Sequence, residues 1–472
     1  MKSLSCSRET AALGGLFALG AFLLWRLYGL TWQFASNVPF SDQWAFWNVL
    51  FDGFQWSDLW HAYQYQHGPH RQGLSFALIV PFYAWSGWNI RVEALINATY
   101  LVVAGLLALR LRCKLLSDPL TAWDGIVLMG FWGVLSHETV FVTPNASHSI
   151  APLALLMLWL NAWVAPLQWW RIGVLLLITH ALCFTGFGVS VMPALAFVVL
   201  LQLWRGPRHL RMEHAVLLLG MALVTLHFSI GYEFNAAVDN FDRLQPSMGE
   251  YARFFTALMQ FFLQRQNSVN LYGWFGLLYG LTLCVVGVWA LLQTASRADS
   301  NVFDRRTAQA HFWPVVLLMV GTTLTFAVLT TYGRTLLGLP AAMASRYTVL
   351  MLPGFFAVYL VLFRFRSHNK IPLLLLLLLM VARLNPEYQT SKHSGEIFGT
   401  IKACWLDAYA ETGDFDVASQ RIDRAFPEVG FQPEWMGTPE QWRYLKAEQL
   451  GPYSTFSRRW GVSAFVPKQC PP

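Results

Sequence analysis

The sequence predicts an all-α polytopic membrane protein, and three observations indicate this fold class. Of the 472 residues, 55% are hydrophobic and only 12% are charged, whereas soluble domains carry about 25% charged residues. Apolar runs of roughly 20 residues recur, and this length crosses a bilayer. Aromatic side chains are abundant, with 22 Trp, 35 Phe and 16 Tyr, as in proteins with aromatic belts at the membrane interfaces. The same composition excludes disordered, collagen-like and coiled-coil chains.

About eleven segments have the length and apolar character of transmembrane helices. One further apolar segment, 73–88, is shorter, contains Pro81 and is rich in Trp and Tyr, so we expect a helix that lies in the membrane interface. The expected spans are 11–30, 92–110, 123–142, 149–164, 171–186, 189–204, 214–231, 271–292, 312–332, 347–363 and 371–384.

The distribution of Lys and Arg predicts the orientation. If the N-terminus is cytoplasmic and 73–88 does not cross, the short basic loops at 110–114, 205–211, 297–306 and 364–370 all lie inside, as the positive-inside rule requires. The net charge of +7 is therefore assigned to loops beside a cytoplasmic (inner) membrane. It is not taken as a sign of nucleic-acid binding.

The last span separates a transmembrane domain, 1–384, from a C-terminal extramembrane region, 385–472. Segment 371–384 has 14 residues, or roughly 21 Å of helix, which is short for a hydrocarbon core near 30 Å. If it spans, the C-terminal region is exported, and we favour this alternative. In an oxidising compartment Cys404 and Cys470 could then form a disulfide, and the alternative is two unpaired thiols.

Charged residues gather just outside the expected exported face. They lie in a first loop, 31–91, in a second large loop, 232–270, and in the turn 333–347. A transporter usually places its ionisable residues near the bilayer midplane, between broken helices. Charges beside the exported face instead favour an enzyme that works on a lipid headgroup at the interface.

The first loop resembles that of the integral-membrane GT-C glycosyltransferases. An acidic residue, Asp42, comes early in the loop, His70 and Arg71 follow, and then come the interfacial segment 73–88, Arg91 and the basic cluster 110–114. Late in the chain, Ser345-Arg346-Tyr347 at the mouth of a span is similar to the Arg-Tyr element of that family. The sequence departs from the family in one respect, because Gln43 follows Asp42 where many members have a second acid. A divalent metal cofactor is therefore in doubt, since one carboxylate makes a poor Mg²⁺ site.

The resemblance implies an inverting transfer of a sugar from a polyprenyl-phosphate donor to an acceptor hydroxyl on a glycan, a lipid or an exported protein such as pilin. Asp42 would serve as the base. Arginine suits the phosphate because its planar fork meets two oxygens at once. The residues expected to bind the phosphate are Arg346, Arg71, His70 and Arg334, and those expected to line the sugar or lipid are Trp44 and Tyr347.

Each of these residues also has a structural alternative. Asp42 could cap a helix that starts at Gln43, and Arg346 could extend its side chain to lipid headgroups. Around an outside turn lie His137, Glu138, Asn145 and His148, which either line the same cavity or form a satisfied turn network. Two rival functions remain at this stage: an O-antigen-type ligase or polymerase, and a lipid or sugar transporter.

Overall fold

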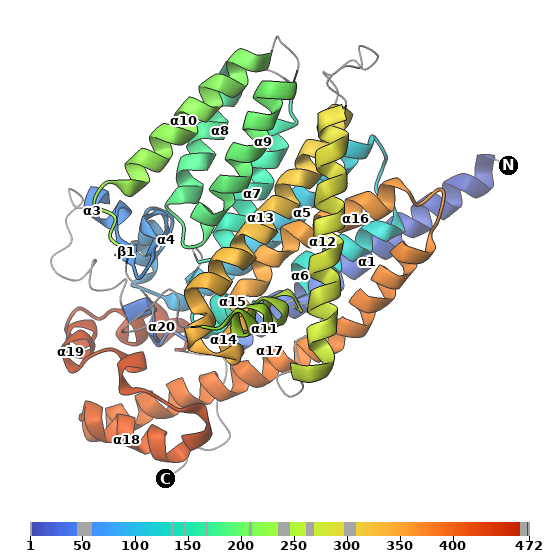
Figure 1. The fold of residues 1–472 in the computed structure, drawn as a ribbon. Coiled ribbons are helices and arrows are strands. Elements are labelled where there is room, and N and C mark those ends of the chain that lie inside the picture. Colours follow the sequence, from blue (N-terminus) through green and yellow to red (C-terminus); the bar gives the residue numbers. More distant parts are fainter. Residues whose placement is uncertain are drawn as a thin grey trace.

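The fold is a helical bundle with a smaller group of helices at one end (Figure 1). The computed structural model describes residues 2–44, 59–133, 136–145, 148–166, 169–206, 210–234, 246–260, 269–296, 308–462 and 470. Parts of the two expected exported loops, 45–58, 235–245 and 261–268, lie outside the described residues. The described residues contain a single strand pair, β1 (Gln66–His67) and β2 (His70–Arg71), which run antiparallel with His67 opposite His70.

Helices make up almost all of the described chain. The α-helices are α1 (Lys2–Phe34), α3 (Leu59–Tyr63), α4 (Gly73–Ser86), α5 (Ile90–Leu116), α6 (Gly125–Trp132), α7 (Ile150–Trp163), α8 (Trp169–Cys183), α9 (Met192–Arg205), α10 (Arg211–Ser229), α11 (Met248–Met259), α12 (Val269–Ser296), α13 (Phe312–Arg334), α14 (Leu339–Ala342), α15 (Ser345–Thr348), α16 (Leu352–Arg364), α17 (Ile371–Thr412), α18 (Phe415–Ala425), α19 (Pro439–Ala447) and α20 (Thr455–Trp460). Short turns connect them, among them η3 (Glu138–Val142), η4 (Gly188–Val191), η9 (Thr335–Leu337) and η12 (Pro433–Met436).

The protein is a membrane protein of the all-α class. Within the described residues, eight helical segments are long and apolar enough to cross a bilayer, and α7 and α8 are shorter apolar helices. The expected interfacial segment forms α4, which is not among the eight. Its C-cap, Gly87, has a φ of 64°, a left-handed conformation that costs glycine little and stops the helix. Trp85 on this helix is 73% exposed, as suits an aromatic side chain at an interface.

Segment 123–142 differs from the continuous helix that its apolar sequence predicts. Helix α6 ends at Trp132, and the chain continues at Ser136 into η3, a single π-helical turn. A side chain at the C-cap, Gly133, would place its Cβ 2.4 Å from the carbonyl oxygen of Met129, so a larger residue here would require the backbone to shift. The π-turn, a feature often found at functional sites, brings Glu138 to one end of the bundle.

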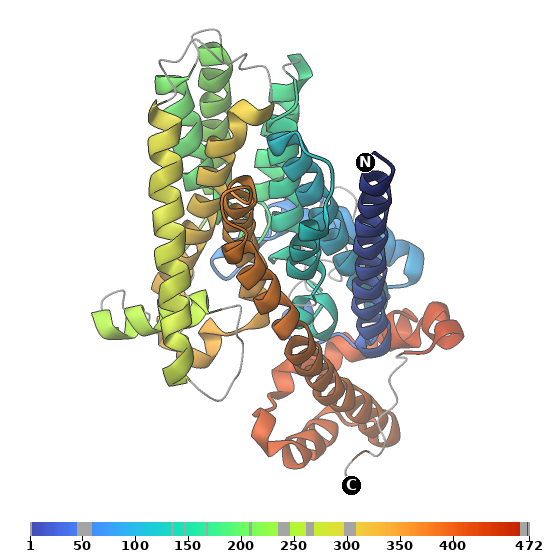
Figure 2. The same ribbon diagram turned by 90° about the vertical axis from the view of Figure 1, so that its right-hand side faces the viewer.

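Helix α17 also differs from the prediction, because it does not end near residue 384. It continues for 42 residues to Thr412 with Pro386 inside it, and it stops at Gly413, whose φ is 69°. At 1.5 Å per residue it is roughly 63 Å long, about twice the hydrocarbon thickness. The first part of the expected C-terminal region is therefore an extension of the last apolar helix, which leads to α18–α20 (Figure 2).

The C-terminal helices pack around a core of their own that includes the chain segment after α1. Trp405, Trp442 and Ile422 are buried in this core together with Phe40 and Trp44. Polar contacts strengthen the association: the Asn37 side chain donates to the carbonyl of Gly451 at 2.6 Å and accepts from the amide of Ile90 at 2.8 Å. The C-terminal region thus fixes the position of the residues that immediately precede Asp42.

A disulfide joins Cys404 on α17 to Cys470, so the pairing that the sequence left open is present. The bond closes a loop of 66 residues, for which the loss of unfolded-chain entropy stabilises the folded region by about 4 kcal/mol.

We expect the disulfide to be detectable by thiol counting. Six cysteines less these two leave four reactive thiols after denaturation. Mass spectrometry of protein that is alkylated in denaturant should show four modified cysteines before reduction and six after it. Six modified cysteines without a reductant would contradict the pairing.

Candidate active site

A cavity of about 400 Å³ opens where the chain after α1 meets the β1–β2 turn, η3 and the ends of α13 and α15. We call it the Asp42 cavity. Its lining is polar and carries charges of both signs. The lining residues are Ser41, Asp42, His67, Gly68, Pro69, His70, Glu138, Thr139, Thr143, Asn145, His148, Arg334 and Arg346.

Asp42 is held by a strained turn. Ser41 has a φ of 54°, which is uncommon for a residue other than glycine and is often found at functional sites. Its amide donates to the carbonyl of Trp435 at 2.7 Å. The side chain of Gln43, which follows Asp42, accepts from the amide of Phe40 and donates to the carbonyl of Pro144. Gln43 therefore fixes the turn, which gives the amide at this position a structural role.

The Asp42 carboxylate faces His67, with Oδ1 3.8 Å from Nε2. Burial raises the pKa of this carboxyl, but the hydrogen bond and charge of His67, together with His148 and Arg346, outweigh burial and lower the pKa to about 2. Burial is the largest single influence on this carboxyl, but it is outweighed by the combined effect of the groups that favour the charged form. Asp42 is a carboxylate at every working pH.

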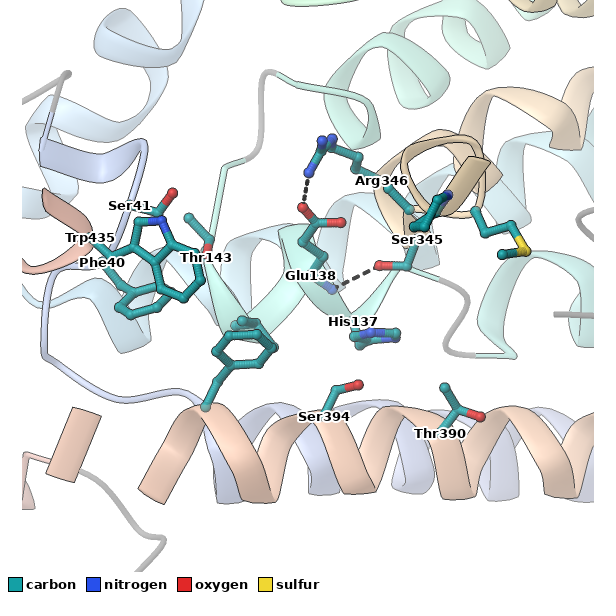
Figure 3. Close-up of a pocket in the computed structure, with 15 residues that line it drawn as sticks. Phe40, Ser41, His137, Glu138, Thr143, Ser345, Arg346, Thr390, Ser394 and Trp435 are labelled. Atoms are coloured by element: carbon teal, nitrogen blue, oxygen red, sulfur yellow. Dashed lines mark hydrogen bonds and ion pairs between the residues drawn. The ribbon is translucent and has the colours of Figure 1, made fainter. Parts of the chain in front are cut away.

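Glu138 and Arg346 form an ion pair on the wall of the cavity (Figure 3). The backbone amide of Glu138 also donates to Oγ of Ser345 at 3.1 Å, so η3 and α15 are joined by two bonds. Lys402 donates to the carbonyl of Val142, and Asn97 donates to the carbonyl of Thr139 at 2.8 Å. Helices α17 and α5 therefore hold the π-turn, and with it Glu138, in place.

Arg334 differs from Arg346 in its partner. Its Nη2 lies 3.5 Å from Nε2 of His70, and within the described residues it forms no ion pair with a carboxylate. Burial, followed by the charge of Arg334, lowers the pKa of His70 to about 3. Burial also lowers the pKa of His148. Both imidazoles are thus neutral near pH 7, and the guanidinium of Arg334 is the positive charge most available to an anionic ligand.

The neutral, enclosed histidines predict a loss of stability in acid. An unfolded His70 binds a proton below about pH 6.5, whereas the folded one does so only near pH 3, so the free energy of unfolding falls as the pH falls between these values. His70→Gln should flatten this decline in thermal unfolding measured between pH 7 and pH 4.5. An identical slope in the variant would contradict the assignment.

Three residues that were expected at the site do not line the Asp42 cavity. Arg71 donates to the carbonyls of Phe228 (2.9 Å), Gln64 and Ile230, so its guanidinium ties the first loop to the end of α10. Trp44 is buried against Trp442, 5.4 Å between ring centroids. Tyr347 is fully buried beside Phe187 and Phe326. Of the predicted set, the structure brings Asp42, His70, Arg334 and Arg346 together in the Asp42 cavity.

A second cavity of about 740 Å³ adjoins the first, and we call it the Trp435 cavity (Figure 3). It lies between η3, the segment 340–346, α17 and η12 of the C-terminal region. Four residues, Ser41, Glu138, Thr143 and Arg346, line both cavities. The remaining lining residues are Phe40, His137, Val142, Pro340, Met343, Ala344, Ser345, Thr390, Ser394, Phe398 and Trp435.

The residues that sequence reasoning left undecided now have positions. Glu138, Asn145 and His148 line the Asp42 cavity, and His137 lines the Trp435 cavity. The signal that could have found Glu138 was an acidic residue inside an otherwise apolar segment, because such residues are costly in a membrane unless paired.

Within the described part of the chain, no group of three or more His, Cys, Asp or Glu side chains could hold a metal ion, and Glu138 is already paired with Arg346.

Comparison of the chain with family models, with curated proteins and with solved structures finds no match.

Proposed function

We propose that this protein is a glycosyltransferase that moves a sugar from a polyprenyl-phosphate donor to an acceptor hydroxyl at the outer face of the cytoplasmic membrane. One observation carries the proposal: an ionised Asp42 shares a small cavity with Arg334 and Arg346, and this cavity lies where several apolar helices end. In this proposal the phosphate of the lipid donor enters the Asp42 cavity, and its polyprenyl chain stays among the apolar helices.

The residues can be assigned to the steps of an inverting transfer. Asp42 accepts the proton of the acceptor hydroxyl. At the same time the oxygen of that hydroxyl forms a bond to the anomeric carbon of the donor sugar. The bond from that carbon to the phosphate oxygen breaks, and polyprenyl phosphate leaves with the electron pair. Arg334, aided by Arg346, stabilises the charge that develops on the phosphate. A low pKa does not prevent this role, because the hydroxyl becomes acidic as it attacks.

The fold supports an exported site. The start of α1 and the C-terminal ends of α9 and α12 lie at the end of the bundle opposite α18–α20 (Figure 1), and basic segments that we expect inside follow these two helices in the sequence. The Cys404–Cys470 disulfide suits an oxidising compartment at the other end. Eleven spans follow if α6 together with the turn after it, α7 and α8 also cross the membrane.

We therefore expect a reporter that is active only outside the cytoplasm to work when fused after Pro472 and to fail when fused after Arg208. Alkaline phosphatase activity, normalised to fusion protein, measures this. Activity after Arg208, or its absence after Pro472, would contradict the orientation.

The function itself is tested in cells. Mass spectrometry of surface glycans, glycolipids and glycoproteins should show one sugar missing from a deletion strain relative to its parent. The wild-type chain should restore that sugar, and Asp42→Asn at equal abundance should not. Identical profiles in parent and deletion strains would argue against a transferase.

A further inference from the structure

The Trp435 cavity has an aromatic wall. The ring of Phe40 lies 5.5 Å from that of Trp435 and 5.8 Å from that of Phe398, both edge-on. The hydrogen bond from the amide of Ser41 to the carbonyl of Trp435 holds the C-terminal region against this wall. Aromatic rings fixed in this way offer an apolar surface to a flat, partly apolar ligand.

The rest of the lining is rich in hydroxyl groups. Thr390 and Ser394 lie four residues apart on α17, so they share one face of the helix (Figure 3). Thr143 and Ser345 belong to the side formed by η3 and α15. Because a hydroxyl both donates and accepts hydrogen bonds, such a lining matches a ligand that itself carries many hydroxyls.

The cavity carries no net charge. Its charged lining residues are Glu138 and Arg346, and they neutralise each other in an ion pair. An anionic headgroup or a phosphorylated glycan finds no unpaired cation here, whereas the neighbouring Asp42 cavity offers Arg334. An acyl chain would bury hydroxyls without partners, which is costly. The volume of about 740 Å³ lies within the range of small-molecule sites.

We propose that the Trp435 cavity binds a neutral saccharide, which is the acceptor of the transfer, and that Trp435 of the C-terminal region is the residue that selects it. This inference rests on the proposed function and names its acceptor class. Ser41, Glu138, Thr143 and Arg346 line both cavities, so a hydroxyl of a saccharide in one cavity faces the donor sugar in the other.

The experiment measures saccharide binding without any donor. The full chain in lipid nanodiscs is studied by saturation-transfer NMR with neutral methyl glycosides, namely disaccharides of glucose, galactose, mannose, rhamnose and N-acetylglucosamine. Glucose 1-phosphate serves as the anionic probe. Trp435→Ala removes the aromatic face, Trp435→Phe keeps part of it, and Arg334→Gln alters only the other cavity.

At least one neutral disaccharide should bind, and Trp435→Ala should weaken its binding at least tenfold. Trp435→Phe should weaken it less, and Arg334→Gln should leave it unchanged while lowering the binding of glucose 1-phosphate. Thiol counting verifies that the C-terminal region of each variant is folded, because the four-thiol result requires the disulfide. If Trp435→Ala fails this check, Ser394→Ala takes its place, with a smaller loss of saccharide binding expected.

Absence of neutral saccharide binding, or unchanged binding in folded Trp435→Ala and in Ser394→Ala, would overturn the inference. Binding of a polyprenol or an acyl chain in competition with the saccharide would overturn it as well. The proposed function fails separately: a chain that binds saccharide but transfers no sugar from any donor retains the site and loses the activity. Conversely, transfer of sugar only to protein acceptors would support the proposed activity and contradict the saccharide site.

Discussion

Asp42→Asn is expected to abolish detectable sugar transfer while the protein remains at normal abundance in the membrane. An amide cannot accept the proton of the acceptor hydroxyl, and help from a general base contributes about 10²–10⁴ in rate. The substitution keeps the size of the side chain and its contact with Ser41 and His67. Transfer is measured with labelled donor, and abundance by quantitative immunoblotting of membranes.

A matched control separates the base from its surroundings. His67→Gln removes the neighbour of Asp42 and leaves the carboxylate in place, so it should reduce transfer far less than Asp42→Asn. If Asp42 were only a helix cap, Asn would replace it almost without cost, because the two residues cap equally well. Wild-type transfer by Asp42→Asn would therefore assign the base elsewhere, and Glu138 would be the next carboxylate to test.

Arg334→Gln is expected to lower the use of donor about 10- to 150-fold in kcat/KM, since a hydrogen bond to a charged group contributes about 1.5–3 kcal/mol. Protein abundance should not change, because within the described residues Arg334 contacts the neutral His70 and pairs with no carboxylate. Arg334→Lys should retain part of the activity, since a point charge survives without the planar fork. Initial rates at varied donor concentration measure both variants.

Arg346 is the informative comparison. Arg346→Gln leaves the Glu138 carboxylate without its partner, so this variant should lose stability as well as activity. Arg346→Lys keeps the positive charge, so its abundance should be closer to that of the wild-type protein than its transfer activity is.

Unchanged donor kinetics in Arg334→Gln would contradict the role of Arg334 in phosphate binding.

The fold class and the positions of most helices follow from hydropathy, because apolar runs in a membrane protein must form helices. Two departures have local causes that hydropathy does not report. Helix α6 ends at Trp132, and its C-cap is Gly133, where a side chain would meet the carbonyl of Met129. Helix α17 continues past its polar boundary near residue 384 although Pro386 removes one hydrogen bond, because residues farther along it, such as Ile401 and Trp405, are buried in the C-terminal core.

The candidate site was predictable in part, because Asp42, His70, Arg334 and Arg346 were predicted from charge beside the membrane and all four line one cavity. It was not predictable where contacts join distant segments. The pairing of Glu138 with Arg346 depends on the π-turn, and the Trp435 cavity exists because the C-terminal region returns to the residues after α1. Arg71 was expected to bind phosphate, but its guanidinium donates to three backbone carbonyls. The sequence does not show that the segments carrying these carbonyls lie beside Arg71.

Transfer from a defined donor tests the central claim most directly. Purified protein in liposomes is given a panel of polyprenyl-monophosphate sugars with radiolabel in the sugar, and membranes of the deletion strain supply the acceptor. The account predicts that label from one of these donors enters the acceptor fraction with the wild-type chain and not with Asp42→Asn. Absence of transfer from every monophosphate donor, with transfer from a diphosphate-linked glycan instead, would contradict it.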